Sequence, residues 1–203
     1  MINKKSKLAI GITILFEIIL IVTAILNTIS KQWNNLLLLV QAIICIILPF
    51  IITYAANKKK LMLPSNFQPI TVIFILLTLY FGEFLKFYSR FWWWDLFLHG
   101  VFGGYVVIIA LYLIQGVIQK EKHVSIKRFA TFSLIFAFCF SITLGTLWEI
   151  FEFLWDYFFK TNMVNGGLED TATDLIIKIV AALITSIIYY FRKLNGSQNN
   201  LKQ

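Results

Sequence analysis

The sequence predicts an all-α fold: a polytopic membrane bundle of six transmembrane helices with both termini in the cytoplasm. Of the 203 residues, 59% are hydrophobic and only 14% are charged, and the mean hydropathy is +0.80. Soluble domains carry roughly 25% charged residues, and one of this length could not bury so much apolar surface. We therefore expect a multi-pass protein surrounded by membrane lipids. The net charge of +8 does not indicate nucleic-acid binding, because the hydropathy already favours a membrane.

Each expected helix is a stretch of about 20 mostly apolar residues, the length that crosses the hydrocarbon core. Six stretches qualify: residues 8–29, 36–54, 70–87, 96–115, 129–153 and 175–191. They leave no room for a soluble domain, so we expect one transmembrane domain over residues 1–192 and a polar cytoplasmic tail over 193–203. The first stretch is longer than the apolar part of a signal peptide, and no small-x-small cleavage motif follows it. It is expected to be retained as a helix.

The expected orientation follows from the basic residues, which gather at alternate ends of the helices. With the N-terminus inside, 13 of the 18 Lys and Arg residues are cytoplasmic, four are external, and Lys178 lies within the sixth helix. The cytoplasmic residues are Lys4, Lys5, Lys7, Lys58, Lys59, Lys60, Lys120, Lys122, Lys127, Arg128, Arg192, Lys193 and Lys202. The external residues are Lys31, Lys86, Arg90 and Lys160.

The acidic residues show the opposite distribution. Glu17 lies within the first helix and Glu121 in a cytoplasmic loop, whereas the other eight lie at the outer ends of helices three to six or in the loops there. These eight are Glu83, Asp95, Glu149, Glu152, Asp156, Glu169, Asp170 and Asp174. The positive-inside rule does not require this, because acidic residues contribute little to topology.

Helical spacing places several of these residues on common helix faces. The sets are Asp95 with His99, Glu149 with Glu152 and Asp156, and Asp170 with Asp174 and Lys178. An ionisable group in the membrane costs about 2.5–3.5 kcal/mol at the helix centre. We therefore expect the three faces to turn inward onto one polar site near the outer leaflet.

Histidine together with several carboxylates suits a divalent metal ion such as Zn²⁺, Mn²⁺ or Fe²⁺, which is the candidate cofactor. The candidate metal ligands are Asp95, His99, Glu149, Glu152, Asp170 and Asp174. The candidate catalytic residues are Glu149, Glu152, Asp95 and His99, with either glutamate as general base or ligand. Lys86, Arg90 and Lys178 are candidates for holding a phosphate.

These motifs resemble the YjdF-like family of small bacterial inner-membrane proteins. The resemblance rests on Trp94-Asp95-x-x-x-His99, on Trp148-Glu149-x-x-Glu152 and on Asp170-Thr171-x-x-Asp174, and covers about residues 70–190. It implies the six-span topology, these acidic and histidine positions and a bacterial plasma membrane, but no particular activity. The first of these elements also resembles that of the VanZ-like membrane proteins linked to glycopeptide resistance.

Three functions fit this pattern. The first is an enzyme acting on a lipid or lipid-linked substrate through metal-assisted or acid/base chemistry. The second is a cation or proton transporter with the acidic cluster as its outer mouth. The third is a noncatalytic assembly, sensing or resistance-type partner whose acidic pocket binds a ligand or stabilises the bundle. Taken singly, Asp95, Asp156 and Asp170 also fit interfacial helix caps, and His99 fits a packing residue.

Two further expectations concern packing. Gly100, Gly103 and Gly104 have the small-residue spacing of close helix–helix contacts in membranes. Cys45 and Cys139 lie in the middle of two helices without paired spacing, so we expect free thiols.

Overall fold

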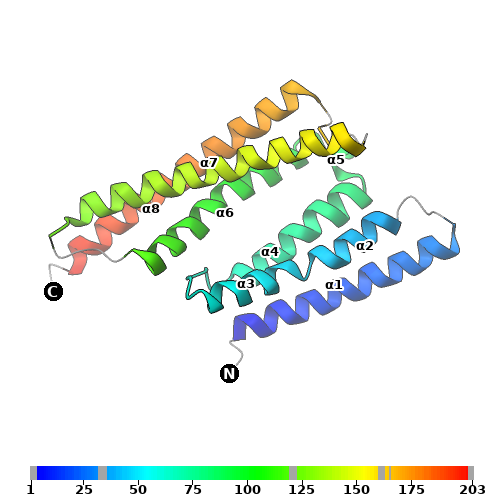
Figure 1. The fold of residues 1–203 in the computed structure, drawn as a ribbon, viewed down its shortest axis with the longest axis horizontal. Coiled ribbons are helices and arrows are strands. Elements are labelled where there is room, and N and C mark those ends of the chain that lie inside the picture. Colours follow the sequence, from blue (N-terminus) through cyan, green and yellow to red (C-terminus); the bar gives the residue numbers. More distant parts are fainter. Residues whose placement is uncertain (1–3, 32–35, 119–122, 160–162, 165, 201–203) are drawn as a thin grey trace. The chain divides into compact units, whose positions relative to one another are not determined.

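The computed structural model describes residues 4–31, 36–118, 123–159, 163–164 and 166–200, and within these ranges the regular structure is helical (Figure 1). The elements are α1 (Lys4–Ile29), α2 (Leu36–Cys45), α3 (Leu48–Lys58), α4 (Phe67–Ile75), η2 (Leu76–Phe84), α5 (Phe87–Arg90), α6 (Trp94–Val117), α7 (Ile126–Phe159) and α8 (Leu168–Asn200). Lys120, Glu121, Lys122, Lys160 and Lys202 lie outside the described residues.

Six helical stretches of the described chain are long and apolar enough to span a membrane. This confirms the expected fold class and number of spans. The positions of the termini relative to the cytoplasm stay a prediction. Helix α8 continues to Asn200, so the first part of the expected polar tail is helical.

The chain divides into two compact units, residues 1–95 and 96–203, and the boundary falls in the first turn of α6. In the first unit, α1 packs against α2 and α4, and α2 packs against η2. Its core contains Leu20, Leu39 and Ala42, surrounded by residues that include Tyr80 and Phe84.

The second span consists of two helices, a break that its apolar pattern did not predict. Helix α2 ends at Cys45, and α3 begins at Leu48 with Pro49 in its first turn. Proline has no N–H to donate to the carbonyl of Cys45, four residues earlier, and its ring clashes with that carbonyl. Pro49 therefore accounts for the interruption.

The third span changes its helical geometry along its length. After α4, residues Leu76–Phe84 form the π-helix η2, and the N–H of Leu85 donates to the carbonyl oxygen of Tyr80, five residues earlier, at 2.9 Å. The span ends at Lys86, whose φ of 63° is left-handed and cannot continue a right-handed helix. This is shortly before the end expected from hydropathy.

The second unit contains α6, α7 and α8, and α7 packs along α8 (Figure 1). The core of this unit includes Val107 and Leu111 of α6, Ala137 of α7 and Ala182 of α8. Small alanine side chains at these contacts let the helices approach closely, as is typical of packing in membranes.

Gly103 lies at a close contact among the three helices of the second unit. A Cβ atom added there would lie 2.6 Å from the backbone oxygen of Lys178 in α8. On its other side, the carbonyl oxygen of Gly103 accepts a 2.7 Å hydrogen bond from Ser141 Oγ of α7. A Cβ at Gly104 would lie 3.0 Å from Thr185 Oγ1, whereas one at Gly100 would make only an ordinary 3.5 Å contact with Ile177. Close packing is confirmed for Gly103 and Gly104.

Replacing Gly103 by alanine tests this contact. We expect Gly103→Ala to lower the free energy of unfolding by about 1–3 kcal/mol, because the new methyl group meets backbone that must shift. Gly100→Ala is the matched control, and its helix-propensity gain of about 1 kcal/mol has no clash to offset it. Reversible unfolding in detergent micelles measures both. Equal stability of the two variants would contradict the assigned contact.

Candidate functional site

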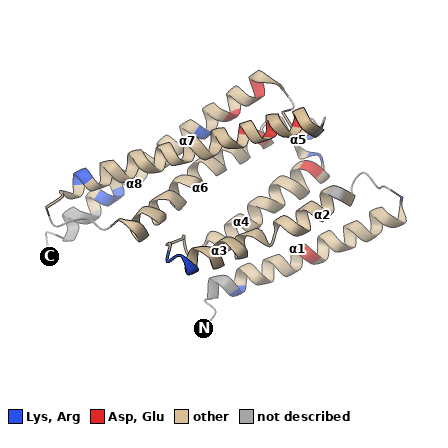
Figure 2. Ribbon diagram, in the orientation of Figure 1, with Lys and Arg blue, Asp and Glu red and all other residues tan. Residues whose placement is uncertain are grey.

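Apart from Lys178, the described charged residues of α7 and α8 lie toward the two ends of these helices (Figure 2). Lys127 and Arg128 begin α7, and Arg192 and Lys193 lie toward the end of α8, so these basic residues share one end. The acidic residues of α7 and α8 lie toward the opposite end, where α7 ends and α8 begins. The polar site is built at this acidic end.

His99 lies between carboxylates of two other helices. Its Nε2 is 3.4 Å from Asp174 Oδ2 of α8, and its Nδ1 is 3.9 Å from Glu149 Oε1 of α7. All three residues are buried, with 7%, 2% and 5% of the surface of His99, Asp174 and Glu149 exposed. The imidazole is therefore within ion-pair distance of a different carboxylate at each nitrogen.

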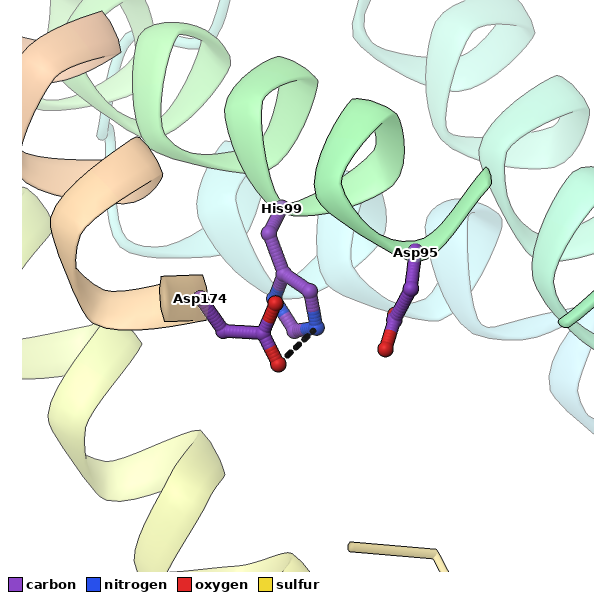
Figure 3. Close-up of side chains that lie close together, drawn as sticks. All are labelled: Asp95, His99 and Asp174. Atoms are coloured by element: carbon purple, nitrogen blue, oxygen red, sulfur yellow. Dashed lines mark ion pairs between the residues drawn. The ribbon is translucent and has the colours of Figure 1, made fainter. Parts of the chain in front are cut away.

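Asp95 adds a further carboxylate on the Nε2 side of the ring. It lies in the first turn of α6, one turn before His99, so both residues project from one face of that helix as their spacing predicted. Figure 3 shows the imidazole of His99 between the carboxylates of Asp95 and Asp174. Asp95 is half-buried, in contrast to the other two residues.

Lys178 brings a positive charge into the same cluster. Its Nζ pairs with Glu149 Oε1, the oxygen that also faces His99 Nδ1, and only 2% of its surface is exposed. Its aliphatic stem lies against Gly145, one turn before Glu149 in α7, where an added Cβ would be 3.1 Å from Lys178 Cδ. The absent side chain at Gly145 thus leaves the space through which Lys178 reaches Glu149.

The other predicted site residues fall into two groups. Glu152, half-buried, can offer a ligand atom together with His99 and Glu149, all within 4.8 Å of one another. The two oxygens of Asp156 instead accept hydrogen bonds from the backbone N–H groups of Met163 and Val164, at 2.8 and 2.9 Å. Asp156 therefore caps the segment after α7, the ordinary alternative that the sequence left open.

Two groups of candidate metal ligands occur in the described part of the chain: Asp95, His99 and Asp174, and His99, Glu149 and Glu152. Asp170, expected as a ligand, belongs to neither and lies in the first turn of α8. Of the residues expected to hold a phosphate, Lys86 directly precedes α5 and Arg90 ends that helix. Cys45 and Cys139 are free thiols, as expected.

Two residues that support the site, Ser141 and Gly145, were not predicted from the sequence. Both lie on the face of α7 that carries Glu149 and Glu152, because positions 141, 145, 149 and 152 repeat at helical spacing. Small residues that continue an acidic face toward the middle of a membrane helix are the signal that would have found them.

The cluster carries an excess of negative charge. Among the described residues, four carboxylates gather around His99, those of Asp95, Glu149, Glu152 and Asp174, and Lys178 contributes an ammonium. Carboxylates this close repel one another in a medium of low dielectric constant unless protons or a cation neutralise them. The arrangement can therefore bind a cation or move protons.

A family model described as "Predicted membrane protein (DUF2238)" matches residues 9–195. The chain belongs to this family. The match covers all six spans and each residue of the cluster, and the chain is an integral, multi-pass membrane protein.

One relative, from Thermotoga maritima, is named only as an uncharacterized protein. It is 29% identical over 140 residues, which cover 68% of this chain and 64% of the relative. The match thus spans less than two thirds of that protein's length. No solved structure matches the chain.

Removing the ammonium of Lys178 tests whether the cluster depends on it. We expect Lys178→Met to lower the free energy of unfolding by about 3–5 kcal/mol, because it leaves the Glu149 carboxylate buried without its partner. Adding Glu149→Gln to this variant should recover at least about 1 kcal/mol, since the unpaired charge is then gone. Unfolding in detergent micelles measures these differences.

The matched control is Lys127→Met, which removes an exposed lysine from α7. Its effect should stay within about 0.5 kcal/mol. If Lys178→Met were as mild as this control, the ion pair would have no structural role.

Proposed function

We propose that this protein is a membrane enzyme that hydrolyses, or transfers a group from, a lipid or lipid-linked substrate at the outer leaflet. The observation that carries the proposal is His99, buried among three helices with Glu149 at one ring nitrogen and Asp174 at the other. Histidine flanked by carboxylates at both nitrogens can bind a metal ion or transfer protons near neutral pH. Either property supports hydrolysis or group transfer.

The depth of the cluster suits a substrate that is partly lipid. Lys178 precedes Arg192 by 14 residues, or about 21 Å along α8 at 1.5 Å per residue. With Arg192 at the cytoplasmic interface of a hydrocarbon core about 30 Å thick, Lys178 lies about 9 Å inside the outer boundary. A headgroup from the interface and the first part of an acyl chain both reach this level.

The residues have distinct roles in this proposal. Glu152 is the general base, because it is more exposed than Glu149 and lies nearer the end of α7. In hydrolysis, the water oxygen bonds to the carbonyl carbon or phosphorus of the ester, and its proton passes to the Glu152 carboxylate. The bond to the leaving oxygen breaks, and that oxygen keeps the electron pair and takes the proton back from Glu152. Lys178 is the counter-ion of Glu149 and no longer a candidate phosphate ligand.

Two further considerations support an enzyme of the bacterial plasma membrane. The motifs resemble those of YjdF-like proteins and, more weakly, those of VanZ-like proteins. Both resemblances fit a substrate of the bacterial envelope. Between Lys178 and Arg192, α8 has no charged residue that would continue an ion path. This favours catalysis at one face over transport across the membrane.

Turnover of lipids by the purified protein tests this proposal. Protein in nanodiscs is incubated with a bacterial lipid extract, and mass spectrometry follows the loss of individual lipids. We expect Glu152→Gln to slow turnover about 10²- to 10⁴-fold, the usual contribution of a general base. Glu169→Gln, an exposed acid in the first turn of α8, is the matched control and should keep the full rate.

Three outcomes would overturn the proposal. The first is full activity of Glu152→Gln, and the second is no turnover of any lipid by the folded wild-type protein. The third is cation flux into proteoliposomes that Glu149→Gln abolishes, which would assign transport instead. If no lipid is turned over and variants that neutralise the carboxylates of the cluster change only the melting temperature, the role of the cluster is noncatalytic.

A further inference from the structure

We propose that one divalent metal ion binds on the Nε2 side of His99, with Asp95 and Asp174 as the other protein ligands. Glu149 is then the carboxylate that orients His99 and not a ligand, because Lys178 holds it. This inference deepens the proposed function, on whose site it rests, by choosing between the two possible ligand groups.

Both candidate ligand groups share His99, so they compete for one imidazole. The group on the Nε2 side contributes two carboxylates, Asp95 and Asp174, whose charge a divalent ion neutralises. The group on the Nδ1 side also contributes two carboxylates, but the ammonium of Lys178 already pairs with Glu149 Oε1. A divalent cation at that oxygen would be repelled by the ammonium, which a buried site screens poorly.

The two nitrogens of His99 each face a carboxylate, as in metal-binding histidines, although the 3.9 Å from Nδ1 to Glu149 Oε1 is longer than a hydrogen bond. Such a histidine binds the metal through one nitrogen and gives its other N–H to a carboxylate, which fixes the tautomer and the ring orientation. Here Nδ1 faces Glu149 at 3.9 Å, while Nε2 faces Asp174 at 3.4 Å on the side where Asp95 lies (Figure 3). Lys178 in turn donates a hydrogen bond to Glu149 and so fixes the position of this carboxylate.

The helices hold the three proposed ligands in place. Asp95 and His99 are one turn apart in α6, and the backbone of Lys178, one turn after Asp174 in α8, packs directly on Gly103 of α6. Three protein ligands leave coordination positions for water or substrate, as in catalytic metal sites. One imidazole with two carboxylates suits Zn²⁺, Mn²⁺ or Fe²⁺ better than Ca²⁺, which prefers oxygen ligands alone.

Equilibrium binding of Mn²⁺ tests the proposal without reference to activity. The full-length protein in detergent micelles is freed of metal with a chelator and titrated with Mn²⁺, and the free ion is followed by its electron paramagnetic resonance signal. We expect one Mn²⁺ per chain. His99→Gln and Asp174→Asn should weaken binding by more than about 100-fold, and Glu149→Gln by about 10- to 100-fold with the stoichiometry unchanged.

Two neutralising variants serve as matched controls. Glu152→Gln removes a carboxylate from the competing group, and Asp170→Asn removes one from α8 a single turn before Asp174. Both should keep one bound Mn²⁺ per chain, with a smaller loss of affinity than His99→Gln or Asp174→Asn causes. Thermal unfolding of each variant confirms that it is folded. If Asp174→Asn does not fold, Asp95→Asn is used in its place, because Asp95 is only half-buried.

Several results would overturn the proposal: no Mn²⁺ or Zn²⁺ bound by the folded wild type, two ions per chain, or loss of binding in Glu152→Gln with binding retained in Asp95→Asn. These results differ from a failure of the proposed function. If the protein binds one ion as described but turns over no lipid, the proposed metal site stands and the proposed enzymatic function is wrong. If the protein turns over lipid but binds no metal, the proposed enzymatic function stands with acid/base chemistry alone, and the proposed metal site is wrong.

Discussion

The ion pair between Lys178 and Glu149 is the interaction on which the second unit depends. Removing two charges from water costs several kcal/mol per ion, and only a close partner in the low-dielectric interior repays this cost. The structure provides that partner by omitting side chains: Gly145 leaves room for the lysine stem, and Gly103 lets α6 approach the lysine backbone. One residue therefore fixes both the packing of three helices and the charge of their polar cluster.

The chemistry of the cluster follows from this pair. Lys178 forms an ion pair with Glu149 and thereby fixes the carboxylate that faces His99 Nδ1. The other ring nitrogen, Nε2, faces Asp174 on the side where Asp95 lies. The negative charge that Lys178 does not balance creates the need for protons or a cation. A binding site for a positive ion and a path for protons are thus consequences of one arrangement of side chains at one end of the unit.

Much of this arrangement could be predicted from the sequence, because helical periodicity depends on local spacing alone. The six apolar spans, the shared face of Asp95 and His99 and the closeness of Gly103 to a neighbouring helix all follow from it. The pairing of Lys178 with Glu149 could not be predicted in this way, because an ion pair between α7 and α8 depends on how the two helices are rotated about their axes. Asp156 shared the spacing of Glu149 but caps residues 163–164, because the chain turns back there. The π-helix η2 left no signal in the hydropathy.

The most direct measurement is an anomalous difference map from crystals of the full-length protein grown with Mn²⁺. We expect a single peak within bonding distance of His99 Nε2, Asp95 and Asp174, with Lys178 still paired to Glu149. A peak between Glu149 and Glu152, with the Lys178 ammonium displaced from Glu149, would contradict this expectation.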